Sequence, residues 1–184
     1  MKKISILASL LLVVLFSACV KTEPEVPNEE EVITTLRYTL SPQPSGADVV
    51  MTFVDLDGDG GNAPTITGGT LDANTTYSGS LELLNEAESP AEDITAEIEE
   101  EDEDHQFFFA TTVANLSVAY SDQDADGNPI GLESTVTTMA AAQGELTITL
   151  RHEPNKSGSG VSNGDITNAG GETDIEVTFP LDVQ

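Results

Sequence analysis

The segment Asp122–Glu133 has the residue spacing of a calcium-binding loop. Asp122, Asp124 and Asp126 alternate ahead of Gly127, and Glu133 is the twelfth residue of the segment. EF-hand loops have this order because carboxylates at alternate positions around a glycine turn supply hard oxygen ligands to Ca²⁺. The flanking residues are typical of strands, so we predict a calcium loop outside an EF-hand. A solvated hairpin turn built from the same residue types is the alternative.

A second acidic segment contains the first half of the same pattern. Asp55, Asp57 and Asp59 alternate ahead of Gly60, but the twelfth residue is Ile66 instead of an acid. The segment therefore offers fewer charged oxygen ligands than an EF-hand loop requires. We predict calcium first at the other loop and second here, with a single ion shared by both loops as a further arrangement.

The two histidines of the chain are the candidates for a transition-metal site. His105 follows the acidic run Glu99–Asp104, and His152 lies far along the chain. On a helix, Glu101 and His105 would lie on one face, and imidazole together with carboxylate suits zinc. Glu101, His105 and His152 are therefore the alternative ligand set, with zinc the second choice after calcium. A solvated charge run with an incidental histidine would explain the same residues.

The sequence gives little support to an enzyme. Gly160–Gly164 matches the G-x-S-x-G motif of a nucleophile elbow, but no histidine follows Ser162 to complete a triad in the chain order of that fold. Cys19 is the only cysteine, and its surroundings indicate a different role. We therefore predict a non-enzymatic protein.

The N-terminal residues resemble the signal of a bacterial lipoprotein. Two lysines precede the apolar run Ile4–Phe16, which is too short to span a bilayer comfortably and ends in Ser17-Ala18-Cys19. The lone cysteine after small residues resembles a lipobox, in which the cysteine is acylated, for example with palmitate, after cleavage. We predict a signal peptide over 1–18 and, over 19–31, a lipidated Cys19 followed by an acidic, proline-containing tether. An ordinary signal peptide is the alternative.

The charge of the chain excludes some partners. Thirty-three acidic residues against six basic ones give a formal net charge of −27. Such a chain repels nucleic acid and anionic membrane surfaces, so membrane attachment would depend on the lipid. Cations and proteins with basic patches are the partners that its charge favours.

From Val32 onward, short runs rich in β-branched and aromatic residues alternate with turn residues. The segment Ser89–Asp93 predicts the start of one acidic helix, with Ser89 as N-cap, Pro90 at the first helical position, and Ile94 and Ile98 on its apolar face. Residues 32–184 are therefore predicted to form an antiparallel, Ig-like β-sandwich of about eight strands. The strand candidates are Val32–Leu40, Asp48–Val54, Thr65–Thr67, Thr76–Leu84, Phe107–Phe109, Leu116–Tyr120, Ser134–Thr138, Glu145–Arg151 and Asp174–Phe179, and Lys156–Glu172 is a predicted loop.

Several stretches together resemble a family of small Bacteroidetes lipoproteins. They include DLDGDGGNAPTITGGTL, LLNEAESPAEDI, EEEDEDHQFFF, DADGNPIGL, LRHEPNK and NGDITNAGGETDIEVTF. The family is often labelled "type 1 periplasmic binding fold superfamily protein", although that fold has two α/β lobes and this chain is about half the length needed. The resemblance implies no activity. It implies an outer-membrane lipoprotein, periplasmic or surface-exposed, and coupling to a TonB-dependent outer-membrane transporter.

These observations lead to two functional hypotheses. The first is a non-enzymatic, lipid-anchored protein of the cell envelope that binds a cation and serves as accessory to an outer-membrane transporter. The second is a structural or protein-interaction lipoprotein in which calcium only makes loops rigid.

Overall fold

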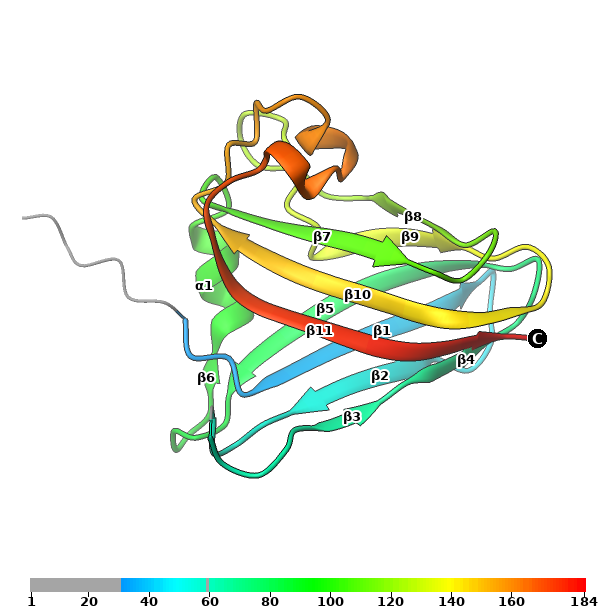
Figure 1. The fold of residues 1–184 in the computed structure, drawn as a ribbon, viewed down its shortest axis with the longest axis horizontal. Helices are drawn as coiled ribbons and strands as arrows, with labels where there is room; N and C mark the ends of the chain where they lie inside the picture. The colour runs from blue at the N-terminus through cyan, green and yellow to red at the C-terminus, as the bar shows by residue number, and fades with distance from the viewer. Residues whose placement is uncertain (1–30, 59) are drawn as a thin grey trace, which may run out of the picture.

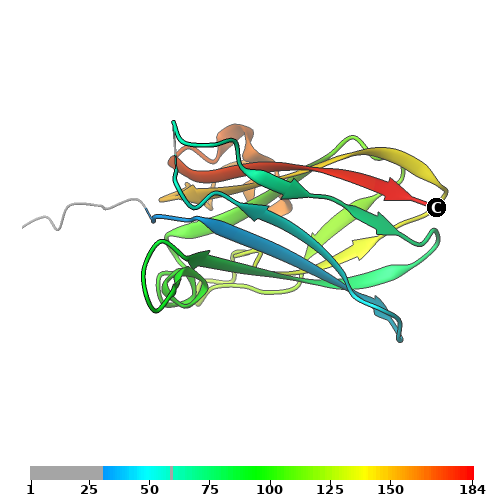
Figure 2. The same ribbon diagram turned by 90° about the horizontal axis from the view of Figure 1, so that it is seen from below.

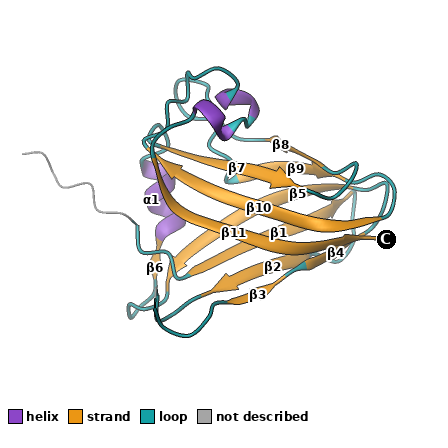
Figure 3. Ribbon diagram, in the orientation of Figure 1, coloured by secondary structure: helices purple, strands orange, loops and turns teal. Residues whose placement is uncertain are grey.

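The computed structural model describes residues 31–58 and 60–184. The predicted signal peptide, Cys19, all of the predicted tether except Glu31, and Asp59 lie outside the described residues. Two β-sheets pack face to face, and one short helix covers one end of the sandwich (Figures 1 and 3). This arrangement confirms the predicted mostly-β sandwich with a single helix. Within the described residues the strands number eleven, against the predicted eight or so.

The larger sheet has seven strands, six of them in one continuous order. Its central strand pairs, β1 with β2 and β1 with β5, are antiparallel, and β6 pairs with the end of β5. The order is β3 (Thr65–Thr67), β2 (Val49–Val54), β1 (Thr35–Gln43), β5 (Thr76–Asn85), β9 (Glu133–Thr137) and β8 (Ser117–Tyr120), with β6 (Glu92–Asp93) beside β5.

The smaller sheet has four strands, in the order β4 (Gly69–Leu71), β11 (Glu172–Val183), β10 (Ala142–His152) and β7 (His105–Thr111). The pairs β10–β11 and β10–β7 are antiparallel, whereas β4 and β11 run parallel. Because β3 and β4 are separated only by Gly68, the chain passes directly from one sheet to the other along this side of the sandwich (Figure 2).

The core lies between the two sheets and follows the period-two alternation of the strands. In β5, Tyr77, Leu81 and Leu83 are buried, as their alternation with polar residues predicts. In β11, Val177 and Phe179 face them from the other sheet as part of the same apolar cluster. The sandwich is therefore held mainly by aliphatic and aromatic burial, which is the dominant favourable contribution to folding.

The helix begins later than the sequence predicts. The structure has α1 at Ile94–Glu100 with Asp93 as the N-cap residue, so the predicted start at Ser89 and Pro90 is wrong. Glu92 and Asp93 instead pair with β5, and that backbone pairing outweighs the local helix-start signal. Ile94 and Ile98 are both buried, which confirms the predicted apolar face.

The remaining differences concern strand ends and short strands. β1 continues through Pro42, beyond the predicted strand end at Leu40, because β2 pairs with β1 only as far as Leu40 and no ladder bond is lost at the proline. The strands β4 and β6 have no counterpart among the predicted strands. The segment predicted as a long loop, Lys156–Glu172, contains two single-turn 3₁₀-helices, Val161–Asn163 and Ile166–Asn168.

No helix within residues 31–58 and 60–184 combines the length and the apolar character needed to cross a membrane.

Candidate metal centre

Four potential metal ligands meet at the end of the sandwich that carries α1. His105 is the first residue of β7, His152 is the last residue of β10, and Asp174 lies near the start of β11. Glu31 reaches the same place from the chain ahead of β1. One ligand atom from each side chain lies within 4.8 Å of all the others. We refer to these four residues as the His–carboxylate centre.

Strand register explains why the two histidines meet. His105 and His152 are direct partners in the β7–β10 ladder, and their ring centroids are 4.5 Å apart. A bulge at Leu150/Arg151 shifts the β10–β11 register by one residue just before this end of the sheet. Adjacent strands thus bring together side chains that lie 47 residues apart in the sequence.

Glu31 connects the two imidazoles. Its Oε1 lies 3.0 Å from His105 Nε2, and its Oε2 lies 3.6 Å from His152 Nδ1. On the other side, His152 Nδ1 lies 3.7 Å from Asp174 Oδ1. The centre is nearly closed to solvent, because the side-chain exposures of the four residues range from 0 to 7%.

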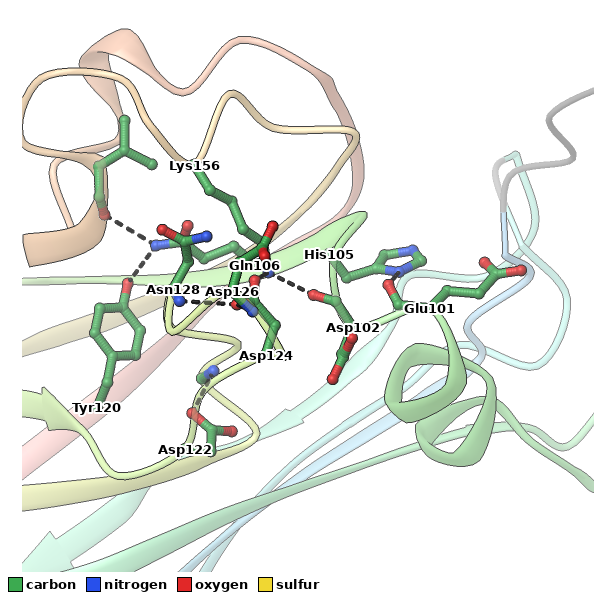
Figure 4. A network of polar contacts seen from close by, with 12 residues as sticks. Glu101, Asp102, His105, Gln106, Tyr120, Asp122, Asp124, Asp126, Asn128 and Lys156 are labelled. Carbon is green, nitrogen blue, oxygen red and sulfur yellow. Dashed lines mark hydrogen bonds and ion pairs between the residues drawn. The ribbon is translucent and has the colours of Figure 1, made fainter.

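The second ring nitrogen of His105 fixes its orientation. Nδ1 donates to the backbone carbonyl of Glu101 at 3.0 Å, as Figure 4 shows. Since a carbonyl only accepts, Nδ1 carries the hydrogen, and Nε2 is left to face Glu31 with its lone pair or a second proton. A metal-ligating histidine is commonly oriented in this way by a backbone carbonyl.

The two charged partners shift each other's pKa. Burial alone would lower the pKa of His105, but the hydrogen bonds to Glu31 and to the Glu101 carbonyl outweigh it and raise that pKa. Burial alone would raise the pKa of Glu31, but its hydrogen bond with His105, a backbone hydrogen bond and the attraction of both histidines together outweigh burial and lower that pKa. Each of the two side chains thus stabilises the charged form of the other.

Two buried atoms of the centre are not hydrogen-bonded within the described part of the chain. Glu31 Oε2 and His152 Nδ1 are both inaccessible to solvent and lie only at the longer ion-pair distance from each other. Buried polar atoms without hydrogen bonds are uncommon in folded proteins, and many of those that occur contact a bound ion or water. A cation between them would satisfy both atoms.

Two clefts border the centre. One, of about 440 Å³, is lined by Glu31 and Asp174 together with Phe53, Asp55 and Glu176. The other, of about 350 Å³, lies along α1 and is acidic, because its lining includes Glu31, Glu92, Glu97, Glu100 and Glu101. A cation reaching the centre by either route would pass carboxylates.

The structure thus brings together two of the three residues of the predicted zinc set. His105 and His152 lie in the centre, whereas Glu101 contributes its backbone carbonyl and its side chain lines the acidic cleft. The sequence does not identify Glu31, which falls in the predicted tether, or Asp174, which falls in a predicted strand. Neither residue has a spacing signal, because both reach the centre only through tertiary packing.

The predicted calcium loop is closed by its own backbone. Asp122 accepts hydrogen bonds from the backbone of Gly131 and Glu133, each at 2.8 Å, and Asp124 accepts from the backbone of Asp126 and Asn128. The side chains of Asp126 and Glu133 belong to exposed residues. Such side-chain-to-backbone hydrogen bonds are typical of a turn stabilised by its own aspartates, which is the alternative to a calcium loop for these residues.

A lysine occupies the place in which this loop would hold a cation. Lys156 Nζ donates to Asp124 Oδ2 at 2.9 Å and also to the backbone carbonyl of Asp102 (Figure 4). The side chains of Lys156 and Asp124 are only 5% and 1% exposed. The ammonium group therefore already neutralises the one buried carboxylate of the loop. Calcium binding here stays a prediction.

The aspartates of the other acidic loop, which begins at Asp55, also accept hydrogen bonds from within their own loop. Asp55 accepts from the backbone of Gly58, and Asp57 accepts from both the backbone and the side chain of Asn62. Asp59 lies outside the described residues. The two acidic loops lie apart in both views of the sandwich, so the arrangement in Figures 1 and 2 does not favour one shared ion.

The G-x-S-x-G segment forms a 3₁₀ turn over Val161–Asn163, not the strand–turn–helix of a nucleophile elbow. Ser162 lines a separate cleft of about 370 Å³ with Tyr120 and Phe109.

Comparison of the chain with models of known protein families gives no match, and comparisons with curated proteins and with solved structures also give none. The resemblance to Bacteroidetes lipoproteins therefore stays a prediction from the sequence motifs.

Proposed function

We propose that this protein binds one divalent transition-metal ion, zinc first, through Glu31, His105, His152 and Asp174. The observation that carries the proposal is the buried convergence of two imidazoles and two carboxylates, whose ligand atoms all lie within 4.8 Å of one another.

The ligand types favour zinc over calcium. Calcium takes six to eight oxygen ligands, whereas zinc takes four ligands and accepts imidazole nitrogen together with carboxylate oxygen. Two carboxylates beside two neutral imidazoles also carry a charge of −2, which a divalent ion neutralises. Such neutralisation matters because an uncompensated charge in a buried site is costly.

The spacing of the ligand atoms suits a four-coordinate ion. With bonds of about 2.0 Å, the corners of a tetrahedron around zinc lie about 3.3 Å apart. Three of the separations, which involve both carboxylate oxygens of Glu31, are 3.0, 3.6 and 3.7 Å, and one ligand atom from each residue lies within 4.8 Å of all the others. The separations lie within about 1.5 Å of the tetrahedral value, so side-chain movements of that size would place all four ligand atoms around one ion.

The wider role that we propose is that of a non-enzymatic, cation-binding protein of the cell envelope, anchored by lipid at Cys19 and serving an outer-membrane transporter. The acidic cleft beside the centre supports a cation as the ligand. The second role is structural, because an ion at the centre would join β7, β10 and β11 to the chain ahead of β1. Exchange of the metal with a chelator within minutes favours the first role, and a metal retained until unfolding favours the second.

The test is metal binding by the purified protein, measured by calorimetry and by thermal unfolding. We expect one zinc ion per chain. At a free zinc concentration of a hundred times the dissociation constant, the added stability is about 2.7 kcal/mol, which corresponds to a rise in Tm of about 5–11 °C. Cobalt at the same site should give the visible absorption of a four-coordinate ion.

Variants separate a specific centre from general attraction to an acidic protein. His105→Asn and His152→Asn should each weaken zinc binding by about a hundredfold or more, whereas Glu100→Gln, which removes a charge from the acidic cleft, should change it less than threefold. Circular dichroism in chelator checks that each variant is folded. If both histidine variants bind zinc as tightly as the wild type, the proposal is refuted.

A further inference from the structure

We propose that metal binding at the His–carboxylate centre is coupled to docking of the chain ahead of β1, with Glu31 as the ligand that closes the site. This inference rests on the proposed function. It assigns Glu31 a role different from that of the three ligands carried by the smaller sheet.

Three of the ligands are positioned by the β-ladders. His105 and His152 face each other at the end of the β7–β10 pair. Asp174 lies at the bulge of the β10–β11 ladder, between Thr173, which pairs with Arg151, and Ile175, which pairs with Leu150. His105 is additionally held by the Glu101 carbonyl. The smaller sheet thus presents two imidazoles and one carboxylate whether or not the fourth ligand is in place. Two histidines and one carboxylate are a sufficient protein ligand set for zinc when an exogenous molecule supplies the fourth ligand.

Glu31 is held differently. It precedes β1 by four residues, and the first backbone hydrogen bond from this stretch to the sandwich, within the described part of the chain, is donated by Thr34 to Leu84 at 3.0 Å. Between them, Val32 is 60% exposed, and Ile33 is partly buried and packs against the apolar core. The Glu31 side chain, by contrast, is only 7% exposed and is bound by the two histidines. The contacts of Glu31 with the two histidines therefore hold residues 31 and 32, ahead of the point where Ile33 packs against the core.

Zinc binding and docking of Glu31 are thermodynamically linked, so each must affect the other to the same extent. If docked Glu31 raises the affinity for zinc by some factor, zinc must raise the docking equilibrium of residues 31–34 by the same factor. Couplings of this kind typically amount to about 5- to 150-fold. We expect at least about tenfold here, because Glu31 supplies one of only four ligands.

The experiment measures both sides of the linkage. Hydrogen–deuterium exchange of the peptide that spans residues 31–34 is followed in chelator and in saturating zinc, for the wild type, Glu31→Gln and the control Glu145→Gln, which changes an exposed acid near the opposite end of β10 from His152. A peptide from the middle of β11 reports global stability, so local protection can be separated from general stabilisation. Calorimetry gives the zinc dissociation constant of each protein.

We expect zinc to slow exchange at residues 31–34 by about tenfold or more, beyond any change in β11, in the wild type and in Glu145→Gln. Glu31→Gln should lose this local effect and bind zinc more weakly by the same factor. Zinc binding without local protection, or with unchanged affinity in Glu31→Gln, would overturn the coupling and leave the proposed function standing. A wild-type protein that does not bind zinc would overturn both.

Discussion

Replacing Lys156 with methionine tests whether the lysine acts as the internal cation of the Asp122–Glu133 loop. The substitution keeps a long apolar side chain but removes the ammonium group that donates to Asp124 and to the Asp102 carbonyl. Asp124 would then remain a buried carboxylate that is held only by the backbone N–H groups of Asp126 and Asn128.

The structure sets the size of the effect. Removing one partner of a buried ion pair costs about 3–5 kcal/mol, because the other charge is left without compensation. Asp124 keeps two backbone donors, so we expect the low end of that range, about 3 kcal/mol. For a domain of this size, that loss lowers the Tm by about 6–12 °C.

Urea denaturation of the wild type, Lys156→Met, Asp124→Asn and the double variant measures the effect and its origin. If the ion pair is responsible, the double variant is less destabilised than the sum of the two single variants. A loss below about 1 kcal/mol in Lys156→Met, or simple additivity, would refute the argument.

The same variants test calcium binding. With the ammonium group removed, Asp124 Oδ2 becomes available, so calcium should raise the Tm of Lys156→Met more than that of the wild type. A calcium-specific rise in the wild type that Asp124→Asn abolishes would instead show that the loop binds calcium beside the lysine.

Three further predictions concern pH and packing. The pKa of Asp124 lies below its ordinary value of 3.8 because the hydrogen bonds from Lys156 and the backbone outweigh burial. The stabilisation by the Asp124–Lys156 ion pair is therefore complete above about pH 4 and is lost as the pH falls further. Urea midpoints should fall more steeply below that pH in the wild type than in Lys156→Met. Burial and the neighbouring acids, Glu92 foremost, raise the pKa of Glu97, so the charge of Glu97 destabilises the fold at neutral pH. Because Glu97 is largely exposed and solvent screens its charge, Glu97→Gln should raise the free energy of unfolding by only about 0.5 kcal/mol at about pH 7 and leave it unchanged near pH 4. Gly79→Ala would place a methyl group 2.6 Å from the Tyr38 hydroxyl and should cost about 1–3 kcal/mol in urea denaturation, whereas a loss below about 0.5 kcal/mol would show that this hydroxyl can move.

The sequence predicts the long strands well because their alternation records burial directly. The predicted strand Thr76–Leu84 matches β5 almost to the residue, and the predictions for β2 and β3 agree with the structure to within one residue. The strands β3, β4 and β6 are all too short for a period to show. The sequence predicts β3 because its three residues are all β-branched, whereas β4 begins with glycine and β6 consists of two acidic residues, which are uncommon in strands. The predicted helix start is misplaced because Glu92 and Asp93 satisfy both a helix-start pattern and a two-residue pairing with β5, and only tertiary contact decides between them.

The candidate site shows the same limit. The chemistry of His105 and His152 marks them as ligands in any fold, and their register in the sheet brings them together. Glu31 and Asp174 are two of 33 acidic residues, so residue type alone does not single them out. The sequence shows the calcium-loop pattern of Asp122–Glu133 directly. It does not show that Lys156 neutralises the buried carboxylate of this loop, because Lys156 lies 23 residues after the loop and belongs to no motif with it.

The position of the two ends of the described chain has a mechanical consequence. The chain enters the sandwich at Glu31 and leaves it at Gln184, at opposite ends of the long axis, and both β1 and β11 run along that axis (Figure 1). A pull between these two points acts parallel to the strands. It loads the hydrogen bonds of each ladder in shear, so that they must break together and not one after another as in peeling. The sandwich is thus oriented to resist tension between its two ends.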